Sequence, residues 1–222
     1  MLDPNTRYIQ IAFNRDASQV RRVLSQIPYD PRIIIEAGTP YLKLTGVAGI
    51  RLIRRMWKGM VVADLKVTDG AVREILFASQ SGANAVTVMG SAPTITIDLF
   101  NANCARYGIY SMVDMLGVTD PLKRLLPLRN RPNFVVIHKG RDEEADVKSI
   151  IRYKDISKVR SKYDTFISVA GGLEPQNVRS AYFNGADVAI LNVIATDDPN
   201  AGLHENEDFP NLIPAILQEV GK

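Results

Sequence analysis

Residues that form covalent cross-links and structural metal sites are scarce in this sequence. The 222 residues include one cysteine, Cys104, so the chain cannot form an internal disulfide. The two histidines, His138 and His204, leave no Cys/His cluster of the kind that binds structural zinc. A disulfide-rich scaffold and a structural zinc site are therefore excluded, and a reducing interior is the expected setting.

Long apolar runs and a large charge of one sign are also missing. No apolar run reaches the roughly 18 residues of a membrane-spanning helix, and the opening MLDPNTRYIQ has no apolar signal region. The 27 Lys and Arg face 24 Asp and Glu, which leaves a formal net charge of +3, and the basic residues are scattered. We therefore expect a cytoplasmic protein that binds neither membranes nor nucleic acid.

Short apolar runs rich in β-branched residues recur along the whole chain. They cover residues 8–13, 32–36, 60–64, 85–89, 108–113, 134–138, 165–170 and 186–192. Helix-like patterns lie between them, at residues 17–27, 41–57, 70–81, 93–107, 175–184 and 211–220, and a short helix broken by proline is expected near 121–132. Eight units in 222 residues leave about 28 residues for each strand, helix and pair of connections.

These runs are apolar almost throughout, as parallel strands covered on both faces should be. The pattern predicts an α/β protein, with a closed (β/α)8 TIM barrel as first choice and an open doubly wound sheet as the alternative. No linker or low-complexity stretch divides the chain, so residues 1–222 are predicted to form a single domain.

Polar residues close most of the predicted strands. They are Asn14, Glu36, Asp64, Asp114, His138, the pair Gly171-Gly172, and Asn192. Any one of them is as readily explained as a cap of the following helix. The strand ends of a (β/α)8 barrel meet at one mouth, however, so together they predict an active site there.

The densest polar cluster is the segment Asp64-Leu65-Lys66-Val67-Thr68-Asp69. Asp64 and Lys66 lie two residues apart, so on an extended strand both point into the barrel while Leu65 packs outward. Carboxylates that hold an ammonium charged and oriented suit the stabilisation of an oxyanion or the transfer of a proton. Asp69 precedes Gly70 and is equally well explained as a helix N-cap.

Glu36 and Asp64 close neighbouring strands and are candidate ligands for Mg2+, which needs only one or two carboxylates beside waters and substrate oxygens. In the alternative, Glu36 pairs with Arg32 or Lys43 instead.

Two further strand ends carry candidate groups. Gly171 and Gly172 offer backbone N–H groups to a phosphate at a helix start, or make only a tight turn. His138 and Arg141 place two proton donors at the mouth, whereas His204 lies in a polar segment, residues 197–208, expected to be a mobile loop.

The segments VADLKVTD, IIIEAGTP, VDMLGVTDP, VIHKGRDEE and SVAGGLEP resemble the orotidine 5'-monophosphate decarboxylase superfamily. The resemblance is strongest to its branch of 3-hexulose-6-phosphate synthases and 3-keto-L-gulonate-6-phosphate decarboxylases, and extends from about residue 8 to residue 196. It implies a homodimeric barrel with shared active sites, a phosphorylated sugar substrate, and Mg2+ that stabilises an enediolate.

The resemblance also implies roles for individual residues. Glu36 and Asp64 would hold Mg2+, Lys66 would stabilise the enediolate, Asp69 would reach the neighbouring subunit's site, Thr39 and Asp114 would contact substrate or hold the lysine, His138 and Arg141 would be catalytic, Gly171 and Gly172 would bind phosphate, and Asn14 and Asn192 would line the substrate site.

Three departures from the family pattern bear on the activity. Asn14 stands where the family usually has Asp, so an anionic group is missing there. Asn192-Val193 stands where the family usually has Gly-Arg. The absence of that arginine removes charge-assisted hydrogen bonds to phosphate, worth about 1.5 to 3 kcal/mol each. Arg141 is typical of the decarboxylases, whereas Gly140 and residues 112–118 are typical of the synthases.

The leading expectation is therefore a lyase similar to 3-hexulose-6-phosphate synthase, which makes or breaks the carbon-carbon bond between ribulose 5-phosphate and formaldehyde through an enediolate. The alternatives are decarboxylation of a keto-sugar acid phosphate or, less favoured, of orotidine 5'-monophosphate. A barrel that binds a metabolite without turnover is the alternative of another class.

Overall fold

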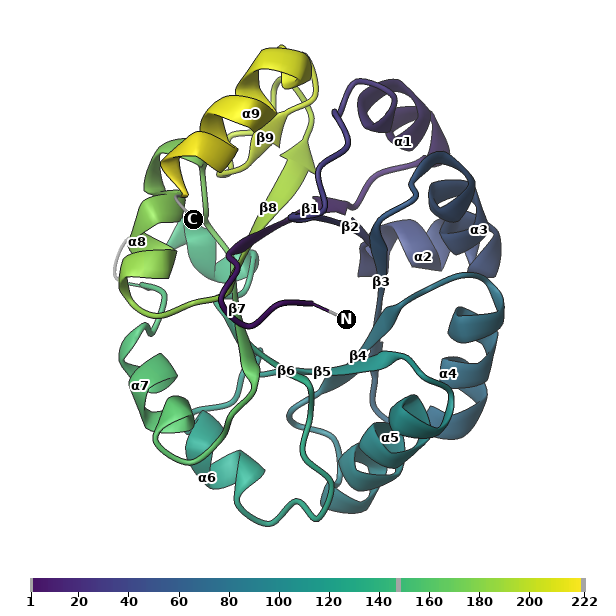
Figure 1. The fold of residues 1–222 in the computed structure, drawn as a ribbon, viewed down its shortest axis with the longest axis vertical. Helices are drawn as coiled ribbons and strands as arrows, with labels where there is room; N and C mark the ends of the chain where they lie inside the picture. The colour runs from purple at the N-terminus through teal and green to yellow at the C-terminus, as the bar shows by residue number, and fades with distance from the viewer. Residues whose placement is uncertain (1, 147–148, 221–222) are drawn as a thin grey trace.

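The computed structural model describes residues 2–146 and 149–220, and in that part of the chain parallel strands close into a barrel (Figure 1). Strand β1 (Tyr8–Phe13) pairs with both β2 (Ile33–Ala37) and β8 (Val188–Ile194), which closes the sheet. The strands between follow in chain order: β3 (Met60–Val67), β4 (Ala85–Met89), β5 (Tyr110–Asp114), β6 (Phe134–His138) and β7 (Phe166–Ala170). This confirms the predicted (β/α)8 barrel and excludes the open sheet.

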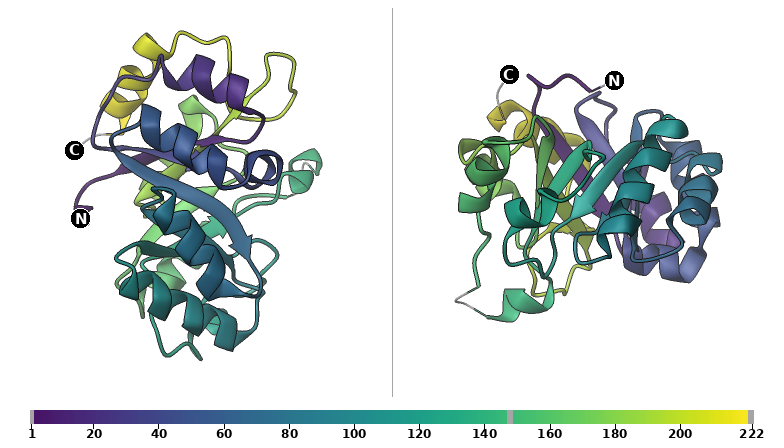
Figure 2. Two further views of the ribbon diagram at one scale, coloured as in Figure 1. Left: turned by 90° about the vertical axis from the view of Figure 1, so that its right-hand side faces the viewer. Right: turned by 90° about the horizontal axis from the view of Figure 1, so that it is seen from below.

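Helices surround the barrel and cover the outer face of its strands (Figures 1 and 2). They are α1 (Ala17–Leu24), α2 (Thr39–Thr45), α3 (Val47–Met56), α4 (Ala71–Gln80), α5 (Thr94–Arg106), α6 (Pro121–Leu125), α7 (Lys154–Arg160), α8 (Val178–Phe183) and α9 (Phe209–Glu219), with 3-10 turns η1 (Asp142–Ala145) and η2 (Pro175–Asn177). Among the described helices, none has the length and apolar character needed to cross a membrane.

Two expectations about these elements were wrong. The single helix expected at residues 41–57 is two helices, because Gly46 between α2 and α3 has a φ of 55° and stops the first one. The loop expected at residues 197–208 contains a short strand, β9 (Leu203–His204), which pairs with the end of β8. His204 is therefore held in a sheet rather than in a mobile loop.

Side chains of the strands alternate between two apolar layers. Those that point outward, such as Ile9 and Ile11, pack beneath the helices in the larger cluster of buried residues. Those that point inward, such as Tyr8 and Phe134, form a smaller cluster inside the barrel. Leu65 packs against the outer layer, as the alternation along β3 predicts.

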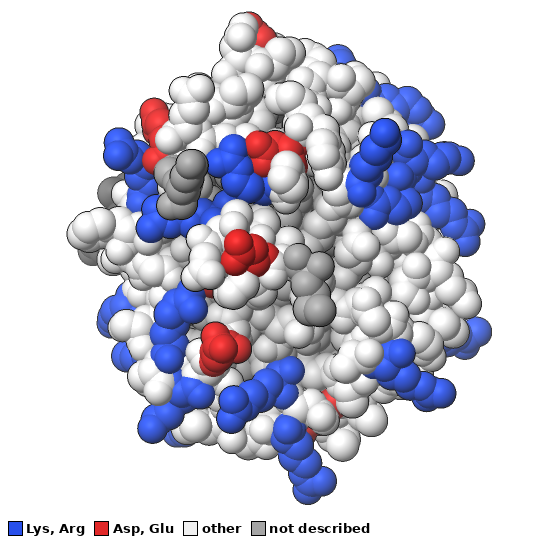
Figure 3. All heavy atoms as spheres, in the orientation of Figure 1, with Lys and Arg blue, Asp and Glu red and all other residues white. Residues whose placement is uncertain are grey.

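The end of the barrel at which the strands begin is closed. The rings of Phe134 and Phe166 stack with centroids 4.9 Å apart, and Tyr8 and Tyr110 each contact one of them edge to face. The N-terminal segment crosses this end, where the Leu2 N–H donates to the Tyr110 hydroxyl at 3.1 Å (Figure 1). On this face Lys and Arg side chains are spread around the periphery rather than gathered at the centre (Figure 3). An entry to the barrel must therefore lie at the opposite end.

Candidate active site

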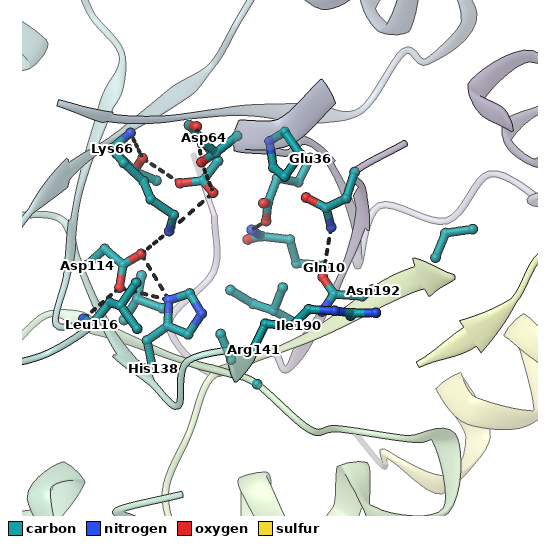
Figure 4. A pocket seen from close by; sticks show the side chains of 18 of the residues that line it. Gln10, Glu36, Asp64, Lys66, Asp114, Leu116, His138, Arg141, Ile190 and Asn192 are labelled. Atoms are coloured by element: carbon teal, nitrogen blue, oxygen red, sulfur yellow. Dashed lines mark hydrogen bonds and ion pairs between the residues drawn. The ribbon is translucent and has the colours of Figure 1, made fainter. Parts of the chain in front are cut away.

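A cavity of about 420 Å3 opens at the carboxyl ends of the strands. Its wall contains most of the residues predicted for the site: Asn14, Glu36, Thr39, Asp64, Lys66, Asp114, His138, Arg141, Gly171 and Asn192 (Figure 4). They come from seven of the eight strand ends or the loops that follow, which explains why residues far apart in sequence meet. Asp69 and Gly172 do not line this cavity.

Lys66 lies between two carboxylates. Its Nζ is 2.5 Å from Asp114 Oδ2 and 3.3 Å from Asp64 Oδ2. Burial disfavours the ammonium form, but the charges of Asp64 and Asp114 outweigh it and hold the pKa of Lys66 above its ordinary value. Lys66 therefore stays a cation whose head group is fixed at the cavity wall (Figure 4).

Asp114 also holds His138. The Nδ1 atom of His138 is 2.9 Å from both carboxylate oxygens of Asp114, and a carboxylate can only accept, so Nδ1 carries the proton of this hydrogen bond. Burial opposes protonation, yet the charge and hydrogen bond of Asp114 raise the pKa of His138 above its ordinary value. The other ring nitrogen, Nε2, points away from Asp114 into the cavity (Figure 4). A pair of this kind orients an imidazole for proton transfer.

Asp114 is 2% exposed, and its ionisation depends on Lys66 and His138. Burial favours the neutral acid, but the charges of His138 and Lys66 outweigh it and hold the pKa of Asp114 well below its usual range. The Leu116 N–H donates to Asp114 Oδ1 at 3.0 Å. Asp114 is thus an ionised carboxylate shared by the lysine and the histidine.

Glu36 lies on β2 beside β3, and its carboxyl accepts a hydrogen bond from the side-chain amide of Gln10. Burial, and then the negative charge of Asp64, raise the pKa of Glu36 to about 8. The alternative in which Glu36 pairs with Arg32 or Lys43 was wrong, because Arg32 pairs with Asp30 at 2.9 Å and Glu36 bonds to Gln10.

The donor set around Glu36 and Asp64 suits Mg2+ bound together with a substrate. The negative charge of Asp64 helps to raise the pKa of Glu36, and a cation between the two carboxyl groups would offset that repulsion. The buried Gln10 Oε1 has no hydrogen-bond partner within the described residues. Over the same residues no group of three or more His, Cys, Asp or Glu side chains converges, so an all-protein metal cage is not present.

Five polar residues of the cavity wall were not predicted from the sequence: Gln10, Arg15, Gln19, Thr87 and Asp198. Two of them, Thr87 and Gln10, hold the predicted carboxylates. The Thr87 hydroxyl donates to Asp64 Oδ1 at 2.7 Å and accepts the Lys66 N–H at 2.9 Å. Gln10 is the partner of Glu36 described above. Each is a polar residue inside an apolar strand, Gln10 in YIQIAF and Thr87 in AVTVM. A polar residue at such a position could have indicated a side chain of the site.

At the opposite wall, Asn14 Nδ2 donates to Asn192 Oδ1 at 3.0 Å and links the ends of β1 and β8. A Cβ at Gly38 would lie 2.0 Å from Asn14 Oδ1 and 2.8 Å from the Phe13 carbonyl oxygen, so glycine here leaves room for Asn14 in this position. Gly171 has a φ of 95°, and a Cβ there would lie 2.0 Å from the Lys139 carbonyl oxygen, so the close turn alone is enough to require glycine.

Arg141 reaches toward this wall from the loop after β6. Its Nη2 lies 2.6 Å from Asp198 Oδ2, and Asp198 belongs to the loop that follows β8. Asp69, in contrast, is exposed outside the cavity. The N-cap of α4 is Gly70, with no side-chain cap, so the alternative that Asp69 caps this helix was wrong.

Comparison with known proteins places this barrel in a family. Residues 7–203 match the family described as "Orotidine 5'-phosphate decarboxylase / HUMPS family". The chain belongs to this family. The resemblance drawn from the sequence motifs is thereby confirmed.

The chain is similar to curated relatives that are named as bifunctional enzymes. It is 39% identical over 186 residues to the "Bifunctional enzyme Fae/Hps" of Methanothrix thermoacetophila, covering 83% of this chain and 47% of the relative. The protein of the same name from Methanosphaera stadtmanae is 33% identical over 220 residues, covering 95% of this chain and 53% of the relative. The chain thus spans about half the length of the curated relatives it matches.

Two solved structures have the same fold. The 3-hexulose-6-phosphate synthase from Salmonella typhimurium superposes with a TM-score of 0.81 at 26% identity, covering 96% of this chain and 99% of the other. KGPDC from Streptococcus mutans superposes with a TM-score of 0.74, covering 97% of this chain and 99% of the other. At 18% identity, the second likeness concerns the fold alone.

Proposed function

We propose that this chain condenses ribulose 5-phosphate with formaldehyde, as a 3-hexulose-6-phosphate synthase does. The observation that carries the proposal is Lys66, Asp114 and His138 in one hydrogen-bonded row, with the carboxyl groups of Glu36 and Asp64 beside it. The similarity to bifunctional Fae/Hps enzymes and to a solved synthase supports it. The reaction needs a base for a carbon-bound proton and positive charge for the resulting enediolate, and the site offers both.

We propose that Glu36 and Asp64 hold Mg2+ at the cavity wall. The ion would supply a divalent positive charge beside the oxygens of the bound sugar phosphate. Glu36 has to lose its proton for this role, and the raised pKa near 8 means that metal and proton compete for it. Gln10 donates to Glu36 and keeps the carboxyl oriented toward the cavity.

Lys66 supplies a second positive charge. Because Asp64 and Asp114 hold its Nζ on two sides, the ammonium is in place before charge develops on the substrate. A preorganised cation of this kind stabilises an oxyanion without the cost of reorganisation at the moment of reaction. Lys66 therefore stabilises the enediolate oxygen that forms when the proton leaves carbon 1.

His138 moves the proton. With Nδ1–H bonded to Asp114, Nε2 of the neutral imidazole takes the proton from carbon 1 of ribulose 5-phosphate, and the bond electrons enter the enediolate. Carbon 1 then forms the new bond to the formaldehyde carbon, whose oxygen becomes an alkoxide. The imidazolium returns its proton to that alkoxide, so the histidine is regenerated.

We propose that the phosphate lies at the wall formed by Gly171, Asn192 and Arg141. The family usually has an arginine at the position of Val193, which lies near the end of β8 in this chain. Arg141 approaches the same strand end from the loop after β6, because its partner Asp198 follows β8. A guanidinium there forms charge-assisted hydrogen bonds with phosphate oxygens.

We also propose a homodimer in which Asp69 completes the neighbouring site. Asp69 is exposed and lies next to α4, outside the cavity of its own chain. The adjoining helices α4 and α5, which pack on each other, leave large apolar side chains exposed: Val72, Phe77, Ile95 and Leu99. An apolar surface of this kind is typical of an interface between subunits.

One observation favours a second candidate, the decarboxylation of a keto-sugar acid phosphate. Arg141, three residues after His138, lines the cavity and is typical of decarboxylases in the resembling branch. In that reaction the enediolate forms by loss of CO2, and His138 or Arg141 then protonates it. The two candidates share the enediolate and differ in how it is made and used.

Proton exchange at carbon 1 of ribulose 5-phosphate in D2O, followed by NMR, tests the shared step. We expect exchange with Mg2+, none with a chelator, and none in Lys66→Ala. Formaldehyde should then convert the exchanging sugar to a hexulose phosphate. Exchange that persists in Lys66→Ala contradicts the role of the lysine, and exchange without condensation favours the decarboxylase.

A further inference from the structure

Thr87 faces the most irregular part of the barrel sheet. Ala63 on β3 pairs with Val86 on β4, but Val67 pairs with Val88, so the regular register is lost between them. The three residues Asp64, Leu65 and Lys66 of β3 are therefore opposite the single residue Thr87. A strand that carries extra residues in this way bulges and loses ladder hydrogen bonds at that point.

The backbone of Lys66 is unusual within this bulge. Its φ is 47°, and among the described residues it is the only one other than glycine with a positive φ. A left-handed conformation is unfavourable for a residue with a Cβ, so the surrounding structure must hold it. The Lys66 N–H, which the interrupted ladder leaves without a strand partner, donates to the Thr87 hydroxyl at 2.9 Å.

The same hydroxyl holds Asp64. Thr87 Oγ1 has one proton, which it donates to Asp64 Oδ1 at 2.7 Å, while its lone pair accepts the Lys66 N–H. The second oxygen of Asp64 lies 3.3 Å from Lys66 Nζ, so a ring of contacts runs from the lysine backbone through Thr87 and Asp64 to the lysine head group. Thr87 is 4% exposed, so water does not readily replace it.

We propose that Thr87 is a positioning residue, which fixes the bulge of β3 so that Lys66 and Asp64 present their charged groups to the substrate together. The proposal rests on the proposed enediolate chemistry for its effect on turnover. It makes a separate claim about the protein itself, which is that the Thr87 hydroxyl determines the conformation of the Lys66 backbone.

Thr87→Val is the decisive variant, because valine keeps the shape and removes the hydroxyl. We expect kcat for condensation to fall about 10- to 100-fold while KM for the sugar phosphate changes less than about 3-fold, since misplaced catalytic groups affect the transition state more than binding. Thr87→Ser, which keeps the hydroxyl, should recover kcat to within about 3-fold of the wild type. If Thr87→Val does not fold, Thr87→Cys, with its weak donor, takes its place with the same expectation.

Thr165→Val is the matched control. Thr165 is also a buried threonine, and its hydroxyl bonds to the Asn133 carbonyl at 2.7 Å where β7 begins, far from the mouth. We expect it to lower stability and leave kcat unchanged. An unchanged kcat in Thr87→Val, or a Thr87→Ser variant as slow as Thr87→Val, overturns the proposal.

The Lys66 amide proton provides a readout that needs no activity. Hydrogen exchange followed by NMR should show it protected in the wild type and in Thr87→Ser, and exchanging at least about 10-fold faster in Thr87→Val. The Val61 amide, which bonds to Asn84 Oδ1 at 2.9 Å on the same strand, is the internal reference and should not change. If the wild type shows no condensation, the proposed function fails while this measurement still decides the role of Thr87. Equal protection of Lys66 in all variants contradicts it.

Discussion

Replacing Asp114 by Asn tests how charge is arranged in this site. The two oxygens of Asp114 face Lys66 Nζ at 2.5 Å and His138 Nδ1 at 2.9 Å, and the residue is buried. Asparagine keeps the size of the side chain but removes the negative charge. Both cations then lose their shared partner, and Lys66 retains only Asp64 at 3.3 Å.

The size of the effect follows from these contacts. Breaking a buried ion pair by removing one partner costs about 3 to 5 kcal/mol. A change of 1 kcal/mol shifts Tm by about 2 to 4 °C in a chain of this size, so Asp114→Asn should lower Tm by roughly 6 to 20 °C. The lower end is the better expectation, because the side chains of Lys66 and His138 are 22% and 20% exposed.

The same contacts predict how the effect depends on pH. Asp114 raises the pKa of His138, so this stabilisation is complete below the ordinary value of 6.5 and is lost as the pH rises through the raised value. The pKa of Asp114 is lowered, so its stabilisation is present above 3.8 and is lost as the pH falls toward the lowered value. The Tm difference between wild type and variant should therefore be widest between about pH 4 and 6.5.

Thermal unfolding followed by circular dichroism at about pH 5.5 and about pH 9.5 measures this difference. Asp98→Asn is the matched control, because Asp98 is also buried but, within the described part of the chain, its side chain accepts only backbone N–H groups, from Arg129 at 2.8 Å and Asn130 at 3.0 Å. Its Tm loss should be the same at both pH values. A loss in Asp114→Asn that does not shrink at high pH, or that is no larger than that of the control, refutes the reasoning.

Three further predictions concern the metal, the phosphate and the dimer. Without metal, the free energy of unfolding of the wild type should fall as the pH rises from about 4.5 to about 8. In this range Glu36 is still protonated in the folded protein but ionised in the unfolded chain, so rising pH favours unfolding. Glu36→Gln should remove this slope in thermal melts and abolish Mg2+-dependent exchange, and an unchanged slope contradicts the assignment. Arg141→Ala should raise KM for the sugar phosphate about 10-fold or more in initial-rate assays, whereas a fall in kcat at constant KM indicates a role in proton transfer instead. Lys66→Ala and Asp69→Ala should each be inactive, and the two variants refolded together should regain activity if each site takes Asp69 from its neighbour, so a mixture that stays inactive contradicts the shared site.

The fold could be predicted because each strand of a parallel barrel is covered on both sides and must be apolar along its length. The runs at residues 8–13, 85–89 and 134–138 match β1, β4 and β6 to the residue. The predicted helix at 41–57 failed at Gly46, because a continuous apolar periodicity does not reveal a backbone that turns to positive φ.

The site was predictable where topology alone brings residues together. Strand ends share one mouth in a closed barrel, so Asp64, Lys66 and Asp114 could be placed there without any distances. Thr87 lies within a strand, and its role depends on a register shift in the neighbouring strand that has no local signal. The Asn14 to Asn192 hydrogen bond joins residues 178 positions apart and is visible only in three dimensions.

The charges in the mouth bear on two of the departures from the family pattern, Asn14 and Val193. Asp64 and Asp114 face Lys66 and His138, so this part of the site is close to neutral when the imidazole is protonated. Because the pKa of Glu36 is raised to about 8, its carboxyl is mostly protonated near neutral pH, so the proposed Mg2+ would replace a proton there and add a net positive charge. An aspartate in place of Asn14 would cancel that gain on the wall beside Asn192. With the amide, the added positive charge would remain available to a phosphate, and by linkage the proposed metal and the sugar phosphate would each strengthen the binding of the other. On the proposed function, Asn14 is therefore the residue that suits a phosphate bound without the family's usual arginine at the position of Val193.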